Sequence, residues 1–223
     1  MDTTIADRLN EIRSTLADGV ELVAVSKFHP AEALREAYDA GQRLFGESRA
    51  QELQAKAPVL PDDIRWHFIG HLQTNKVRPV VTYASMIESI DSEHLLEAVD
   101  REAEHQGKTI DVLLQVHVAA EETKFGFSPE ELLDFFRARK FESLKATHIC
   151  GLMAMASNTD DSGRVRADFE RVVALRDEIL SICPDLRRFD VLSMGMSDDY
   201  GIAMECGSTH VRIGTAIFGP RQY

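Results

Sequence analysis

The stretch Glu21-Leu22-Val23-Ala24-Val25-Ser26-Lys27 ends a short apolar run on a lysine. Its apolar residues include two valines and no breaker, which predicts a buried strand. Side chains alternate along a strand, so Val23, Val25 and Lys27 share one face. A lysine held at the edge of a core loses hydration, which favours the neutral amine that attacks carbonyl groups. A solvated lysine at a strand end fits the same stretch, so the stretch alone leaves both interpretations open.

Further short strands follow this one, and helical patterns separate them. We expect these strands at residues 43–47, 64–70, 84–90, 110–118, 147–153, 189–192 and 209–213. One of the helix starts is unambiguous, since Ser128-Pro129-Glu130-Glu131 combines an N-cap serine, a proline at the first helical position and a capping-box glutamate. Strands that alternate with helices pair in parallel through right-handed crossovers. Eight such units predict an α/β fold, a single (β/α)₈ TIM barrel, with an open doubly wound sheet as the alternative.

One helix precedes the lysine strand and has no place in the eight units. Ile5, Leu9, Ile12 and Leu16 fall on one helical face, and Asp18-Gly19 ends the pattern. We therefore expect residues 1–18 to form an added N-terminal helix. No linker or low-complexity segment interrupts the rest, which predicts one domain over residues 1–223.

The composition restricts the classes of partner. The chain has 25 Lys and Arg against 37 Asp and Glu, a net charge of −12. This acidic balance argues against a nucleic-acid or anionic-membrane surface. No apolar run approaches the roughly 18 residues of a membrane span, and the N-terminus lacks a signal-peptide pattern. Three scattered cysteines without metal-ligand spacing predict a protein of the reducing cytoplasm without a metal site.

The ends of the last two expected strands are rich in glycine and hydroxyl groups. In TIM barrels the loops after these strands frequently bind phosphate. Ser193 and Thr215 offer hydroxyl donors, and Gly214 lets the backbone approach a ligand closely. Two ordinary glycine-containing turns would look the same, so this signal is weak on its own.

Arg212 is more informative, because its neighbours on either side would pack against helices. That pattern directs Arg212 and His210 toward the barrel mouth. A buried arginine needs an acceptor, and the structural alternative to a ligand is an inward carboxylate such as Glu47 or Glu88. His67 and His117 share the inward phase of Lys27. For both histidines we favour a satisfied core residue over a ligand.

A lysine, a phosphate site and an arginine around one mouth suit an aldehyde that carries a phosphate. Pyridoxal 5′-phosphate meets that description, with Lys27 forming the imine and Arg212 meeting the ring nitrogen. An aldolase that forms a Schiff base with a phosphosugar would use the same lysine and phosphate site.

Six runs of the chain carry a specific resemblance to a known family. They are Ala24-Val25-Ser26-Lys27, the eleven residues 66–76, Lys124-Phe125-Gly126, Gly151-Leu152-Met153, 192–199 and 211–219. Over nearly its whole length the sequence resembles the pyridoxal phosphate homeostasis protein family. The resemblance implies a barrel of the alanine racemase N-terminal type, with Lys27 as the cofactor lysine. It also implies phosphate contacts from Ser193, Gly214 and Thr215, and a ring-nitrogen contact from Arg212.

The sequence departs from the family pattern at two places. Ser48 stands where the family often has asparagine, and near the end of the fifth expected strand His117 takes the place of another asparagine. Any contact of the asparagine at the first place cannot be carried over. Neither change touches the lysine or the phosphate loops.

The resemblance implies a protein that keeps free pyridoxal phosphate in balance inside the cell. We expect it to hold the cofactor and to deliver it to other proteins, PLP-dependent apo-enzymes among them. The alternatives are an amino-acid racemase and, less favoured, the phosphosugar aldolase. Alanine racemases take a second acid/base, a tyrosine, from a separate C-terminal domain. Because this chain ends at Pro220-Arg221-Gln222-Tyr223, we expect that domain to be absent and the protein to hold its cofactor without turnover.

Overall fold

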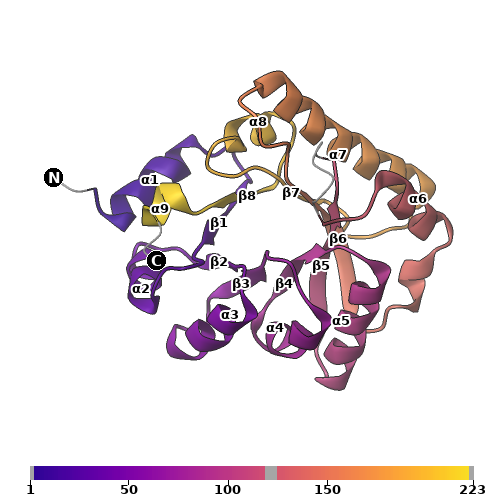
Figure 1. Cartoon of the computed structure of the whole chain (residues 1–223), viewed down its shortest axis with the longest axis horizontal. Coiled ribbons are helices and arrows are strands. Elements are labelled where there is room, and N and C mark those ends of the chain that lie inside the picture. The colour runs from indigo at the N-terminus through magenta and orange to yellow at the C-terminus, as the bar shows by residue number, and fades with distance from the viewer. Residues whose placement is uncertain (1–2, 119–124, 221–223) are drawn as a thin grey trace.

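Eight parallel strands form a closed barrel in which each strand pairs with the next along the chain and β8 closes on β1 (Figure 1). The computed structural model describes residues 3–118 and 125–220. The strands are β1 (Glu21–Val25), β2 (Leu44–Glu47), β3 (Arg65–Phe68), β4 (Met86–Ile90), β5 (Ile110–Val116), β6 (Thr147–Ala154), β7 (Val191–Ser193) and β8 (His210–Ile213). The closed barrel confirms the predicted fold class and excludes the open sheet.

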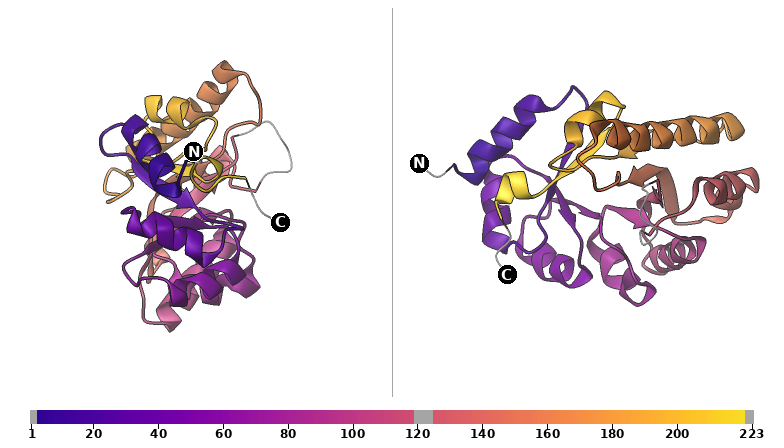
Figure 2. Two further views of the ribbon diagram at one scale, coloured as in Figure 1. Left: turned by 90° about the vertical axis from the view of Figure 1, so that its left-hand side faces the viewer. Right: turned by 45° about the horizontal axis from the view of Figure 1, so that its top comes forward.

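Helices surround the barrel and connect its strands. They are α2 (Ala31–Asp39), α3 (Ala50–Lys56), α4 (Val77–Tyr83), α5 (Glu93–His105), α6 (Pro129–Arg137), α7 (Ser162–Ile182), α8 (Tyr200–Glu205) and α9 (Thr215–Phe218). The predicted capping box starts α6: the Ser128 hydroxyl accepts from the Glu131 amide, and the Glu131 carboxylate accepts from the Ser128 amide. The long helix α7 is seen along its length in the right-hand view of Figure 2.

The added N-terminal helix is present as α1 (Ile5–Thr15), which lies beside α9 in Figures 1 and 2. Thr4 caps it in a capping box with Asp7. The Arg8 side chain donates to the carbonyl of Ile217 in α9, and the Ile5 amide donates to Glu36 in α2. These contacts attach α1 to the helices that flank the junction of β8 and β1.

The two faces of β1 have different surroundings, as the alternation predicts. Leu22 and Ala24 belong to the large apolar core between strands and helices, whereas Val23 and Val25 are buried outside that cluster. Val23 pairs with Arg212 of β8. The inward phase therefore runs through Val23 and Val25 toward Lys27, in line with the sequence prediction.

Some local structure differs from the expected elements. A three-residue 3-10 helix at Thr74–Lys76 stands where the sequence predicts the start of a helix, and another at Ala57–Val59 follows α3. The short α8 was not predicted, because six residues carry too little periodicity to be recognised. Lys124 and Tyr223 lie outside the described residues.

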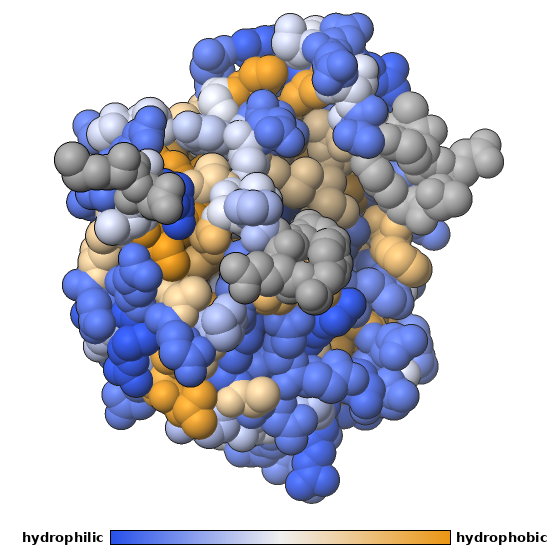
Figure 3. Space-filling view, turned by 60° about the vertical axis from the view of Figure 1, so that its left-hand side comes forward, coloured by the Kyte–Doolittle hydropathy of each residue, from blue (hydrophilic) through white to orange (hydrophobic). Residues whose placement is uncertain are grey.

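The surface is mainly polar on the side that Figure 3 shows, where apolar residues gather only in small groups. Among the described residues, no helix combines the length and the apolar character needed to cross a membrane.

Candidate functional site

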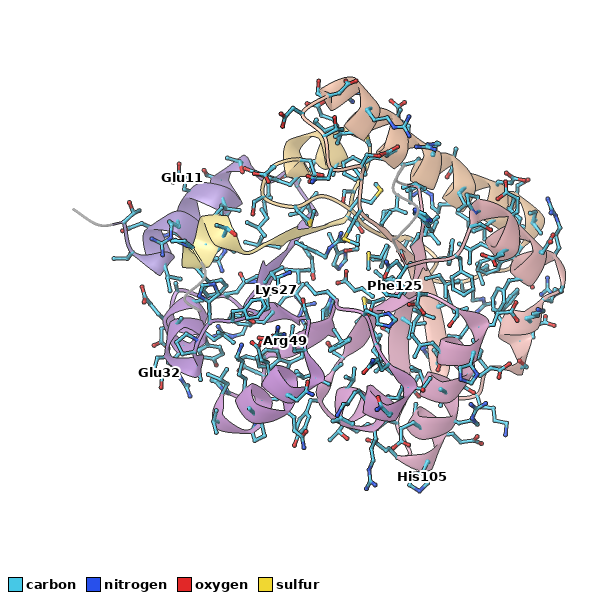
Figure 4. The ribbon with its side chains drawn as sticks, viewed as in Figure 1. Glu11, Lys27, Glu32, Arg49, His105 and Phe125 are labelled. Carbon is cyan, nitrogen blue, oxygen red and sulfur yellow. The ribbon has the colours of Figure 1, made fainter. Side chains whose placement is uncertain are left out.

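Lys27 lies in the turn that follows β1, and its side chain is half-buried. Figure 4 shows it near the middle of the barrel, inside the ring of helices. The loop after β8 comes very close to this position, since a Cβ atom added to Gly214 would lie 3.0 Å from the carbonyl oxygen of Val25. The structure thus brings the predicted lysine and the predicted phosphate loop together.

Arg212 projects into the barrel interior and is only 5% exposed. Its Nη1 donates to the carbonyl oxygen and to the hydroxyl of Ser193, each at 2.6 Å, and its Nη2 donates to the carbonyl of Ala154 at 2.9 Å. Burial lowers the pKa of Arg212, and the nearby Glu88 carboxylate opposes that shift.

Glu88 is the buried counter-ion of this site and is fully shielded from solvent. Its Oε1 lies 2.6 Å from Nδ1 of His67, its Oε2 accepts from the Ser193 hydroxyl at 2.6 Å, and Oε2 lies 3.8 Å from Arg212. Burial alone would raise the pKa of Glu88, but the contacts with His67, Arg212 and Ser193 together lower it to about 2. Because an ionised carboxylate only accepts hydrogen bonds, Nδ1 of His67 must carry its hydrogen.

The structure gives the contacts of three side chains that the sequence analysis singled out. The Ser193 hydroxyl donates to Glu88 and accepts from Arg212, so its proton is directed at the buried carboxylate and not toward the phosphate loop. His210 starts β8 and lies 3.7 Å from Glu21 at the amino end of β1, so it does not face the mouth. Arg212 does have the carboxylate partner considered above, and that partner is Glu88.

Glu47, the other carboxylate considered for Arg212, belongs to a separate buried cluster. It pairs with Lys56, which also contacts Glu52. This cluster lies beneath the turn of Lys27 and was not predicted, because only the tertiary fold brings α3 against that turn. The inward histidine His67 is a satisfied core residue, as expected, while His117 is half-buried directly after β5.

The Glu88 site predicts a loss of stability in acid. The pKa of Glu88 is lower in the folded protein, at about 2, than the ordinary value of 4.5, so the unfolded chain takes up the proton first as the pH falls. The stabilisation is complete above about pH 4.5 and is lost progressively toward pH 2. Urea unfolding between pH 5 and 3 should show this loss in the native protein and a weaker one in Glu88→Gln. Equal pH slopes for the two proteins would contradict the assignment.

The loops after β7 and β8 each pass close to a neighbouring segment at a glycine. Gly195 has a φ of +92°, and an added Cβ would lie 2.6 Å from that of Ala203 and 2.8 Å from the Cα of Tyr200. Only glycine lets the loop pass so close to α8. Gly214 is half-buried and Thr215 is exposed, so the Thr215 side chain is accessible where the barrel opens.

A cleft of about 460 Å³ lies beside these loops, between the segments that follow β6 and β7. Ser157, Met196 and Asp199 are among its lining residues. Within residues 3–118 and 125–220, no group of three His, Cys, Asp or Glu side chains could hold a metal ion.

Comparison with known proteins places this chain in a defined family. The family described as "Alanine racemase, N-terminal domain" matches residues 3–222. The pyridoxal phosphate homeostasis protein of Pasteurella multocida is 39% identical over 209 residues, which cover 92% of this chain and 88% of the relative. That of Schizosaccharomyces pombe is also 39% identical, over 98% of this chain and 94% of the relative.

Solved structures agree with this family. PipY of Synechococcus elongatus with PLP bound is 40% identical and superposes with a TM-score of 0.88, covering 97% of this chain and all of PipY. The structure of PipY without PLP has a TM-score of 0.92 at 41% identity. Alanine racemase from Bartonella henselae shares only the fold, with a TM-score of 0.73 at 18% identity over 97% of this chain and 58% of the racemase.

Proposed function

The chain belongs to the family of pyridoxal phosphate homeostasis proteins, and we propose that it binds pyridoxal 5′-phosphate, holds it as a Schiff base on Lys27 and delivers it to other proteins. One observation carries this proposal: Gly214, which opens the phosphate loop, packs against Val25, two residues before Lys27. An aldehyde and a phosphate of one small molecule can then reach the lysine and the loop at the same time.

The residues present fit this cofactor. Thr215 is exposed at the start of α9, where its hydroxyl and the backbone can donate to a phosphate. Arg212 has five N–H donors, and its contacts within the described residues use three of them. The remaining donors suit an acceptor such as the ring nitrogen. The Ser193 hydroxyl supports Arg212 indirectly, because it joins Arg212 to Glu88 by hydrogen bonds.

The bond on Lys27 is a simple condensation. The unprotonated Nζ attacks the aldehyde carbon, a C=N bond replaces C=O, and the oxygen leaves as water after proton transfer. Because Lys27 is only half-buried, water can leave and a competing amine can enter. That exposure supports reversible holding and transfer, with PLP-dependent apo-enzymes as recipients.

We favour holding over catalysis, in accord with the names of the relatives. Pyridoxal phosphate supplies an electron-accepting ring when it drives amino-acid reactions. Glu88 stabilises the charge on Arg212, and a permanently charged donor leaves the ring nitrogen unprotonated, which weakens that electron sink. Arg212 fits the racemase alternative equally well, because a racemase binds the same cofactor. It does not fit the aldolase alternative, because a phosphosugar has no ring nitrogen to accept its hydrogen bond.

The thiols support a reducing compartment such as the cytoplasm. Cys150 and Cys183 are buried, Cys206 is half-buried, and all three are free. Burial raises the pKa of Cys150 to about 12, which makes this thiol unreactive.

Borohydride reduction followed by peptide mapping tests the proposal. The purified protein with pyridoxal phosphate should show the absorbance of an imine, and reduction should fix the cofactor on the peptide that contains Lys27. Lys27→Ala should lose both signals, because it removes the amine that forms the imine. Lys76→Ala is the matched control near the mouth and should keep both. An adduct on Lys56, Lys76 or Lys124 of the native protein would refute the assignment.

A further inference from the structure

The backbone on both sides of Lys27 is held by one short helix, α3. On the amino side, Nζ of Lys56 donates to the carbonyl oxygen of Ser26 at 2.9 Å. On the carboxyl side, the amide of Phe28 donates to Oε2 of Glu52 at 2.8 Å. The two residues that flank Lys27 in the chain are therefore each fixed by a side chain of the same helix.

These two contacts belong to one buried ionic cluster. Nζ of Lys56 lies 2.7 Å from Oε1 of Glu47 and 2.8 Å from Oε2 of Glu52. The Ser26 hydroxyl donates to the same Oε1 of Glu47 at 2.7 Å. Lys56 is only 7% exposed and Glu47 is not exposed at all. Buried charges are costly to desolvate and contribute little net stability, so their place directly under the lysine turn indicates a positioning role.

The turn itself has a conformation that needs such support. Phe28 has a φ of +66°, in the left-handed region that residues with a Cβ rarely adopt. The hydrogen bond to Glu52 holds its amide in place, and the guanidinium of Arg49 covers its ring at 4.3 Å from the centroid. On the other side of the turn, the ring of His29 stacks on Phe218 of α9 at 5.1 Å. The turn is thus fixed between α3 and the helix of the phosphate loop.

We propose that Lys56 and Glu52 are positioning residues, which hold Ser26 and Phe28 so that the amine of Lys27 meets the aldehyde in a productive geometry. The inference rests on the proposed role of Lys27. Neither residue need touch the cofactor, because the backbone on each side of Lys27 sets the direction of its side chain. Loss of either contact loosens the backbone beside Lys27, and neither Lys56 nor Glu52 is part of the phosphate loop.

The rate of imine formation after pyridoxal phosphate is added to cofactor-free protein tests this proposal. Glu52→Ala removes the acceptor of the Phe28 amide and should slow the reaction roughly tenfold to hundredfold, as small misplacements of a reacting group do. Glu52→Gln keeps an acceptor oxygen and should react at close to the native rate. Glu97→Ala, on the exposed face of α5, is the matched control and should also react normally.

A second variant covers the case in which Glu52→Ala does not fold. Glu47→Gln/Lys56→Met removes both charges of the buried pair together, which is better tolerated than the loss of one partner, and it frees the carbonyl of Ser26. This variant should show slowed imine formation with native circular dichroism. Native rates in folded Glu52→Ala or in the double variant would overturn the positioning role. Absence of any adduct on Lys27 in the native protein would instead refute the proposed function.

Discussion

Replacing Arg212 with methionine is expected to lower the free energy of unfolding by about 3–5 kcal/mol, because it leaves the buried Glu88 charge without its cationic partner. Arg212 is also joined to Glu88 through the Ser193 hydroxyl, and it donates to the carbonyls of Ser193 and, on β6, Ala154. Three hydrogen-bond acceptors inside the barrel thus lose their donor at once. Urea unfolding at pH 7 measures the change.

A double-variant cycle separates the charge from the lost packing. Glu88→Gln in the Arg212→Met background removes the uncompensated charge and should recover part of the lost stability. Arg101→Met, which breaks an exposed pair on α5, is the control and should cost at most about 1 kcal/mol. A loss at Arg212 no larger than that at Arg101, or no recovery in the double variant, would contradict a buried ion pair.

The barrel could be predicted from the sequence because its signal is repeated eight times. Short apolar strands alternate with helices that begin at recognisable caps such as Ser128, so an error at one boundary does not change the fold. The ends of short elements could not be fixed. The strand expected at 189–192 is observed as β7 at Val191–Ser193, since its bounds depend on pairing with β6 and β8.

The site was predictable where it follows from strand phase and not where it follows from contacts across the fold. The alternation of β1 and β8 placed Lys27 beside the mouth and Arg212 inside the barrel. The contact of Ser193 with Glu88 joins residues distant in the chain. The same holds for the hydrogen bonds of Lys56 and Glu52 to the backbone on either side of Lys27. Spacing within one segment carries no information on such pairs.

The phosphate is expected to supply much of the affinity for the cofactor. Each hydrogen bond to a charged group contributes about 1.5–3 kcal/mol, so two of them at Gly214 and Thr215 contribute about 3–6 kcal/mol if they are additive. Pyridoxal, which lacks the phosphate, should therefore bind roughly a hundredfold to ten-thousandfold more weakly than pyridoxal phosphate. Titration of the native protein with both compounds, followed by the imine absorbance, measures the ratio.

Substitutions near the mouth distinguish the phosphate loop from the Arg212 network. Thr215→Val should weaken the binding of pyridoxal phosphate by about tenfold to hundredfold and leave pyridoxal unchanged, because one donor to the phosphate is lost. Ser193→Ala should weaken both compounds alike, since its hydroxyl joins Arg212 to Glu88. Thr82→Val, at the end of α4 that precedes β4, makes the same chemical change as Thr215→Val at the opposite end of the barrel and should alter neither. Equal affinity of the native protein for pyridoxal and its phosphate would remove the phosphate loop from the site, because a loop that binds the phosphate must distinguish the two.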